Sequence, residues 1–188
     1  MAKNVLFGNE IDRMPDFVFR MMKILFVIYY FFRPPGKYLK KFGIMPGFTV
    51  VDYGCGTGAF IRDTSELVGT TGNVYAVDIH ELAIDSVQKI IRKHNLKNVS
   101  TFLTDGQKTA IEDGAADLIF ALDMFHMISD TGTFLKELNR ITKKNGVLII
   151  EDGHQPRALS KEKIIRSGCW TIAGEEKKFL RCIPVTRS

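Results

Sequence analysis

A run of glycines flanked by two aspartates is the part of this chain best suited to chemistry. Residues 50–58 read Val-Val-Asp-Tyr-Gly-Cys-Gly-Thr-Gly, and Asp78 follows 20 residues after Gly58. Glycine has no Cβ, so the backbone can turn tightly there and approach a ligand closely. A helix expected from Ala59 would direct its positive amino end at that ligand. Asp78 ends an apolar run, where a carboxylate can accept both hydroxyls of a ribose. The pattern therefore predicts a pocket for a nucleoside-containing cofactor.

The glycine spacing is compatible with more than one cofactor. Gly54-x-Gly56-x-x-Ala59 also satisfies the dinucleotide pattern G-x-G-x-x-G/A, so a nicotinamide cofactor is an alternative. Asp52 argues against it, because a carboxylate two residues before Gly54 repels a pyrophosphate and attracts a cationic amino acid group. A chain of 188 residues also leaves little room for a second, substrate-binding domain of the usual dehydrogenase kind.

The spacing Asp-x-Gly-x-Gly-x-Gly resembles the nucleotide-binding loop of class I S-adenosylmethionine-dependent methyltransferases. The resemblance runs from about residue 40 to the C-terminus. Thr104-Asp105-Gly106 ends a third apolar run, where that family places an acid near the adenine amino group. Residues 117–123 resemble the family's fourth strand, and residues 145–150, after a helix expected to end at Lys143-Lys144, resemble the fifth.

The resemblance implies S-adenosyl-L-methionine as cofactor, with S-adenosyl-L-homocysteine as product. The glycines contact its methionine and ribose parts, Asp52 holds the ammonium group, Asp78 binds the ribose, and Ile79 packs on the adenine. Asp105 meets the adenine N6 unless it is only a turn residue before Gly106. Asp123 and Met124 border the sulfonium. The resemblance thus implies this cofactor-binding set: Asp52, Gly54, Cys55, Gly56, Gly58, Asp78, Ile79, Asp105, Gly106, Asp123 and Met124.

Methyl transfer from a sulfonium is an in-line displacement that needs a general base only when the acceptor arrives protonated. His126, three residues past the expected fourth strand, is the candidate base, and ordinary packing between its neighbours is the alternative. Glu151, Asp152 and His154 follow the expected fifth strand and either shape the acceptor pocket or lie in a solvated loop. We expect His80 to be peripheral, and we expect no metal ion.

The acceptor is predicted to be a small molecule. Residues 123–126 read Asp-Met-Phe-His and lack the prolines of the Asn/Asp-Pro-Pro-Tyr motif found in relatives that methylate amides and exocyclic amines. The surrounding sequence resembles the broad small-molecule group that includes quinone and sterol methyltransferases. Nucleic acid is not expected as a partner, because residues 48–188 carry no net charge. A nicotinamide-dependent oxidoreductase and a non-catalytic nucleoside-binding module remain the competing interpretations.

The N-terminal extension, residues 1–47, carries the whole net charge of +5. It holds eight of the 26 Lys and Arg residues but only three of the 21 Asp and Glu residues. Residues Phe17 to Phe32 form a nearly continuous apolar helix, interrupted by Arg20 and Lys23, and are too short for an ordinary span of about 20 residues. One hypothesis is a hydrophobic lid, with residues 17–41 contacting a membrane surface; the aromatic stripe itself is more typical of a packed helix. Packing on the sheet or in a homodimer is the alternative.

The elements that must position these residues alternate between strand and helix. The expected fold is α/β: a Rossmann-like, seven-stranded, mostly parallel sheet with helices on both faces, an α/β/α sandwich whose last two strands form a hairpin. Residues 48–188 form this domain. The expected strands are Thr49–Asp52, Val74–Asp78, Ser100–Thr104, Leu118–Asp123, Val147–Glu151, Trp170–Ala173 and Phe179–Ile183. The expected helices are Ala59–Val68, Leu82–His94, Thr133–Ile141 and Ser160–Arg166.

The three cysteines, Cys55, Cys169 and Cys182, show neither metal-binding spacing nor an even disulfide set. This usage favours a reducing compartment, so we expect a cytoplasmic protein, with membrane association through the extension as an addition.

Overall fold

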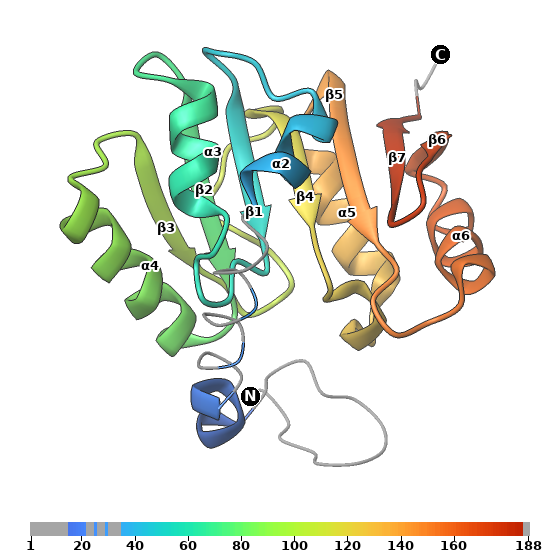
Figure 1. Ribbon diagram of the computed structural model, residues 1–188. Coiled ribbons are helices and arrows are strands. Elements are labelled where there is room, and N and C mark those ends of the chain that lie inside the picture. Colours follow the sequence, from blue (N-terminus) through green and yellow to red (C-terminus); the bar gives the residue numbers. More distant parts are fainter. Residues whose placement is uncertain (1–14, 22–24, 26–28, 30–34, 186–188) are drawn as a thin grey trace.

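The computed structural model describes residues 15–21, 25, 29 and 35–185. One seven-stranded sheet runs through them in the order β3-β2-β1-β4-β5-β7-β6 (Figure 1). The strands are β1 (Thr49–Tyr53), β2 (Asn73–Asp78), β3 (Val99–Leu103), β4 (Ala116–Ala121), β5 (Thr142–Glu151), β6 (Trp170–Glu175) and β7 (Phe179–Pro184). Their number and sequence positions confirm the predicted fold class.

The first five strands are parallel, and β7 runs antiparallel to both of its neighbours. The chain moves outward from β1 through β2 to β3, then returns to the other side of β1 for β4 and β5. The strand order therefore reverses between β1 and β4. In open parallel sheets, ligands bind outside the carboxyl ends of the strands at such a reversal.

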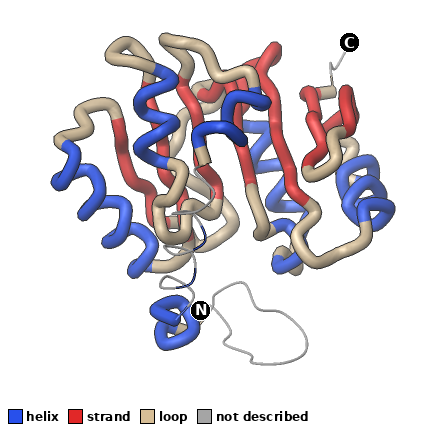
Figure 2. The backbone as a smooth tube through the Cα atoms, viewed as in Figure 1, coloured by secondary structure: helices blue, strands red, loops and turns tan. Residues whose placement is uncertain are grey.

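Helices cover both faces of the sheet, as Figure 2 shows. One face packs against α2 (Gly36–Leu39), the 3₁₀ turn η1 (Lys40–Phe42), α3 (Ile61–Val68) and α4 (Glu81–His94). The other packs against α5 (Thr131–Ile141) and α6 (Arg157–Arg166). Because successive strand residues point to opposite faces, Val50 belongs to the first core and Val51 to the second. The two cores make the predicted three-layer sandwich.

Several predicted boundaries were wrong. α3 begins at Ile61, not Ala59, because Ile61 N–H bonds Gly58 O at 3.2 Å and closes a turn first. α5 starts at Thr131, not Thr133. It ends at the predicted Ile141, so Lys143 and Lys144 lie in β5 and do not end the helix. Thr142 Oγ1 donates to Leu138 O at 2.6 Å, and the β-branched Thr142 already has extended backbone angles.

The last two elements also differ locally from their predictions. α6 starts after Pro156, so Ser160 lies inside the helix, where its hydroxyl accepts a bond from Gln155 Nε2 at 2.9 Å. β6 extends through Gly174 and Glu175, and the hairpin turn falls at residues 176–178 instead. A register shift between Ile172 and Gly174 lets the strand continue past the glycine.

Much of the predicted N-terminal helix, Phe17 to Phe32, lies outside the described residues. Residues 16–21, the N-terminal helical segment, are helical and lie beyond the carboxyl edge of the sheet (Figure 1). Leu39 and Phe42 are completely buried in the first core, so residues 36–42 pack as part of the sheet domain. The domain boundary at residue 47 stays a prediction. In the described part of the chain, no helix has both the length and the hydropathy to cross a bilayer.

Candidate functional site

A cavity of about 380 Å³ opens at the carboxyl ends of β1 to β5, where the strand order reverses. Loops after all five of these strands contribute to its wall, together with Phe19 from the N-terminal helical segment. Of the expected cofactor-binding residues, only Gly58 is absent from the lining. The others that line it are Asp52, Gly54, Cys55, Gly56, Asp78, Ile79, Asp105, Gly106, Asp123 and Met124.

The glycine loop is fastened to the end of β2. The N–H groups of Gly54 and Cys55 donate to Val77 O at 2.8 and 3.0 Å, and Gly56 N–H donates to Asp78 Oδ2 at 2.8 Å. Gly54 has φ +83°, and a Cβ there would lie 3.0 Å from Met124 Cγ. The loop after β1 is therefore held by β2 beside it, and it packs closely against Met124 in the loop after β4.

Gly58 has a packing task and does not face the cavity. A Cβ added there would lie 2.7 Å from Ile90 Cδ1 and 3.1 Å from Val87 Cγ2, both on α4. Its φ of +78° also suits glycine. The third glycine thus allows the turn into α3 to approach α4 closely, which is a different function from the predicted cofactor contact.

Two buried carboxylates, those of Asp52 and Asp78, lie in the wall of the cavity. Asp52 is 3% exposed, and its Oδ2 is buried without a hydrogen-bond partner among the described residues. Burial raises the pKa of Asp52, and the Asp78 carboxylate raises it further. Burial also raises the pKa of Asp78, against the effect of its bonds from Gly56 N–H and, at 2.9 Å, His80 N–H. This arrangement fits a bound cation such as the ammonium group of an amino acid.

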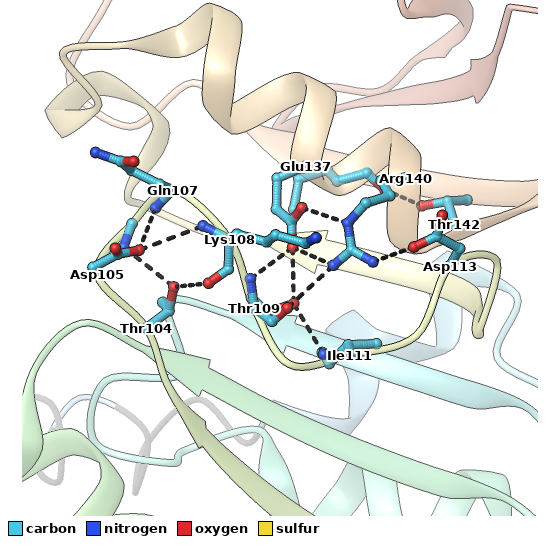
Figure 3. Close-up of polar contacts among 12 residues, drawn as sticks. Thr104, Asp105, Gln107, Lys108, Thr109, Ile111, Asp113, Glu137, Arg140 and Thr142 are labelled. Atoms are coloured by element: carbon cyan, nitrogen blue, oxygen red, sulfur yellow. Dashed lines mark hydrogen bonds and ion pairs between the residues drawn. The ribbon is translucent and has the colours of Figure 1, made fainter.

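The loop after β3 places Asp105 in the cavity wall, and side chains of α5 anchor this loop (Figure 3). Asp105 Oδ1 accepts the N–H groups of Gln107 and Lys108, which lower its pKa. Asp105 is therefore a turn residue and also part of the cavity wall, so it agrees with both alternatives from the sequence. Its contact with the adenine N6 stays a prediction. Gly106 is next to Ile79: a Cβ on it would lie 3.7 Å from Ile79 Cγ2.

Glu137 of α5 is the centre of that anchor. Its Oε1 accepts both the N–H and the hydroxyl of Thr109 at 2.8 Å, and Arg140 bonds both carboxylate oxygens at 2.7 and 2.8 Å. Arg140 also bonds Asp113 and, at 3.2 Å, Thr109 O. Burial raises the pKa of Glu137, but its bonds from Arg140 and Thr109 outweigh burial and lower it overall. A buried ionic network thus fixes the loop that carries Asp105.

The loops after β4 and β5 form the other half of the cavity. Asp123 has φ +51°, a conformation that is uncommon for a residue with a Cβ. Tyr38 Oη donates to Glu151 Oε1 at 2.5 Å, which ties α2 to the end of β5. Burial raises the pKa of Glu151 despite that bond. Asp123, Met124 and Glu151 all line the cavity.

His126 and His154 meet in this half with their ring centroids 4.9 Å apart, edge to face. His126 Nδ1 is buried and has no hydrogen-bond partner among the residues described. Partial burial lowers the pKa of His126, and His154 and Lys163 add to the effect while Asp123 opposes it. A neutral imidazole at the cavity wall can accept a proton, so its predicted role as a base stays a prediction.

His80 is a site residue that the sequence did not reveal, and it meets Phe19, which belongs to the segment proposed as a lid. His80, expected to be peripheral, is 3% exposed, lines the cavity and caps α4, its Nδ1 accepting Leu82 N–H at 3.2 Å. Phe19 lies over it with ring centroids 4.5 Å apart, and Asp16 Oδ1 is 3.5 Å from His80 Nε2. The position of His80 directly after Asp78 and Ile79 could have indicated a site residue. Its contact with Phe19 could not, because Phe19 is distant in the sequence.

Comparison with solved structures identifies the class of protein. The chain superposes on a SAM-dependent methyltransferase from Aquifex aeolicus with a TM-score of 0.73 and 28% identity, over 81% of this chain and 90% of that one. A methyltransferase structure from Methanococcus maripaludis, 19% identical, matches 100% of this chain and 98% of that one with a TM-score of 0.72, and shows the same fold. The fold is that of a class I S-adenosylmethionine-dependent methyltransferase.

The chain belongs to the methyltransferase domain family, whose model matches residues 44–183. Among curated proteins it is similar to the demethylmenaquinone methyltransferase of Lactococcus lactis subsp. lactis (strain IL1403), 28% identical over 127 residues, 67% of this chain and 50% of that protein. The corresponding enzyme of Lactobacillus johnsonii (strain CNCM I-12250 / La1 / NCC 533) is 29% identical over 121 residues, 64% of this chain and 50% of that protein. The match thus spans about half the length of these relatives.

These findings confirm the predicted family and S-adenosylmethionine as its cofactor. They do not favour the nicotinamide-dependent alternative. The role of each individual site residue remains a prediction.

Proposed function

We propose that this protein transfers a methyl group from S-adenosylmethionine to a lipophilic, hydroxylated small molecule of the quinol type. The observation that carries the proposal is the unpartnered oxygen of Asp52, buried beside Asp78 in the wall of a cavity lined by loops from five strands. An unpaired buried carboxylate oxygen is costly, and a cationic ligand would remove that cost.

The residues on the first three strands hold the cofactor in this proposal. Asp52 accepts the ammonium group, and Asp78 accepts the ribose hydroxyls with the oxygen lone pairs that Gly56 and His80 leave available. Ile79 and Gly106 border the adenine, whose amino group meets Asp105. When bound, the cofactor supplies an electrophilic methyl group on a positive sulfur. The protein's remaining work is to align the acceptor and exclude water.

The residues after β4 and β5 hold the acceptor. His126, with its lowered pKa, is neutral at neutral pH and available to take a proton from an acceptor hydroxyl. A quinol-type acceptor is supported by the likeness to demethylmenaquinone methyltransferases. It also suits the apolar residues Phe19, Phe134 and Ile128 in the cavity wall.

Calorimetric titration with S-adenosylmethionine, S-adenosylhomocysteine and NAD in parallel tests the cofactor half. We expect micromolar binding of the two sulfur nucleosides and none of NAD. Binding of NAD with neither sulfur compound recognised would contradict the proposal. The acceptor half is tested with labelled S-adenosylmethionine and a panel of reduced quinones, with polar amines as comparators. Turnover of the amines alone would exclude a quinol-type acceptor.

The N-terminal helical segment has a second proposed task, which is contact with a membrane surface where a lipophilic acceptor would be found. Phe17 and Met21 lie four residues apart within this segment and are both exposed; Leu25 and Tyr29, beyond it, are exposed as well. Side chains at this spacing share one face of a helix. Exposed apolar faces beside basic residues bind anionic membranes.

Replacing Phe17 and Met21 together by serine tests this contact, with Ile165→Ser, an exposed apolar residue on α6, as the matched control. We expect the double variant to lose sedimentation with vesicles containing anionic lipid and the control to retain it. Equal vesicle binding by both would reject the membrane contact. A change in the oligomeric state of the double variant alone would favour a homodimer.

A further inference from the structure

Three side chains that commonly ligate metal ions converge in the acceptor half of the cavity. Asp123 and His126 follow β4 and His154 follows β5, so they come from adjacent strands. Each offers one ligand atom, and these atoms all lie within 4.8 Å of one another. We propose that Asp123, His126 and His154 bind a divalent first-row transition metal ion that coordinates an oxygen of the acceptor. The acceptor's part in this inference rests on the proposed function.

The donor set suits such an ion. Imidazole nitrogens favour zinc, iron, nickel and copper over magnesium and calcium, and two imidazoles with one carboxylate recur in sites that keep open positions. Zinc bonds of about 2.0–2.2 Å place two ligands of one ion roughly 3.5 Å apart, so the side chains need only a small rotation to close on it. Asp123 is exposed and His126 is only partly buried, which leaves room for that rotation.

The backbone of both loops is shaped around this cluster. Asp123 takes a positive φ, at a cost that a residue with a Cβ normally avoids. Gly153, next to His154, has φ +64°, and a Cβ there would lie 1.9 Å from His126 Nδ1. Only glycine therefore permits the His126 ring to lie where it does. The two loops thus accept conformational costs that bring the imidazoles and the carboxylate together.

A metal ion here would do work that the side chains alone do poorly. With three protein ligands it retains open positions, and a hydroxyl of the acceptor bound there loses its proton to water more readily. Such an ion would hold the acceptor oxygen beside Asp123, His126 and His154. His126 then acts as a ligand, which differs from the role of base predicted for it. The sequence analysis expected no metal ion, because these ligands are separated in the chain by a helix and a strand.

Titration of tag-free protein with Co²⁺ and with Zn²⁺ tests the inference without any turnover. We expect one ion per chain, visible as Co²⁺ absorption bands and as heat of Zn²⁺ binding. His154→Asn and His126→Asn should each weaken Co²⁺ binding at least tenfold. His94→Asn, at the exposed end of α4, is the matched control and should leave it unchanged.

Three outcomes would overturn the proposal: no stoichiometric Co²⁺ binding, equal Co²⁺ affinity in wild type and His154→Asn, or a thiolate charge-transfer band that places the ion at Cys55, which lines the same cavity. Titration of each variant with S-adenosylhomocysteine separates this inference from the proposed function. Protein that binds S-adenosylhomocysteine but not Co²⁺ refutes the metal site alone. Circular dichroism and thermal melting establish that each variant is folded.

Discussion

The two halves of the cavity are built in different ways. On the proposed cofactor side, two of the three carboxylates are fixed by backbone donors: Asp78 accepts two N–H groups and Asp105 accepts two more, whereas Asp52 Oδ2 has no partner among the described residues. On the acceptor side, the polar groups stand on the loops after β4 and β5, and His126 Nδ1 has no partner among the residues described. A cofactor of constant shape can be met by fixed hydrogen bonds. Unused bonding capacity therefore occurs in both halves, on the Asp52 carboxylate in one and on the His126 imidazole in the other, and each suits a different ligand.

The anchor of the cofactor side should be the most sensitive to change. Glu137→Ala leaves Arg140 with one fewer partner and two donors of Thr109 unsatisfied. Because removing one partner of a buried pair is strongly destabilising, we expect a loss of about 3 kcal/mol. For a chain of this size that corresponds to a melting temperature lower by roughly 6–12 °C. Asp85→Ala, on the exposed side of α4, is the control.

The stability that Glu137 contributes should also depend on pH. Its pKa is lowered in the folded protein, so the contribution is present above the ordinary pKa of 4.5 and is lost as pH falls through the folded value. Melting curves of wild type and Glu137→Ala should therefore converge in acid. Curves that stay equally far apart down to pH 3 would show that charge plays no part.

The next largest effect should come from Asp78, which joins the glycine loop to the start of α4. Asp78→Ala removes the acceptor of Gly56 N–H and His80 N–H as well as the proposed ribose contact. We expect S-adenosylhomocysteine affinity to fall by about a hundredfold, because charge-assisted bonds contribute about 1.5–3 kcal/mol each. Calorimetry measures it. An undiminished affinity would remove Asp78 from the cofactor site.

Asp52→Asn should separate stability from binding. It removes a buried charge that repels Asp78, so the protein without cofactor should melt higher by about 2–4 °C. The same variant should bind S-adenosylhomocysteine about tenfold less tightly, because the ammonium group loses its counter-ion. A lower melting temperature with normal affinity would show that Asp52 is structural only.

The pH dependence of Asp52 gives the same test in the wild-type protein. Its pKa is raised in the folded protein without ligand, so the folded state takes up a proton above pH 3.8, where the unfolded chain remains ionised. Stability without cofactor should therefore rise as pH falls through the folded pKa toward 3.8, while cofactor affinity falls over the same range. In Asp52→Asn both slopes should flatten.

The smallest effect should appear on the acceptor side alone. Gly153→Ala places a methyl group where His126 Nδ1 lies, so the imidazole must move. We expect acceptor turnover to fall about tenfold, or roughly 1.4 kcal/mol, with S-adenosylhomocysteine affinity unchanged. Gly69→Ala, at a positive φ with open space around it, is the control for backbone strain. Loss of cofactor affinity in Gly153→Ala would show that the two halves are not independent.

The features that could be predicted from the sequence are those that depend on local patterns. The order of strands and helices, and the carboxylates at strand ends, were predictable because each depends on local hydrophobic pattern and on glycine spacing. The packing of Gly58 against Ile90 could not be predicted, because it depends on how the turn into α3 packs on α4. The anchor at Glu137 joins residues 28 apart in sequence, and the Tyr38–Glu151 bond joins residues 113 apart. Neither leaves a local pattern to read.

Because the Phe19 ring lies over His80 in the cavity wall, ligand binding should be coupled to the packing of residues 16–21. Phe19 belongs to the first core and to the cavity wall at once, so a ligand that packs against it gains affinity from the helix that carries it. By reciprocity the ligand stabilises that helix by the same free energy. Saturating the cavity should therefore slow hydrogen exchange at residues 16–21, and the size of the slowing would measure how much of the affinity this segment supplies.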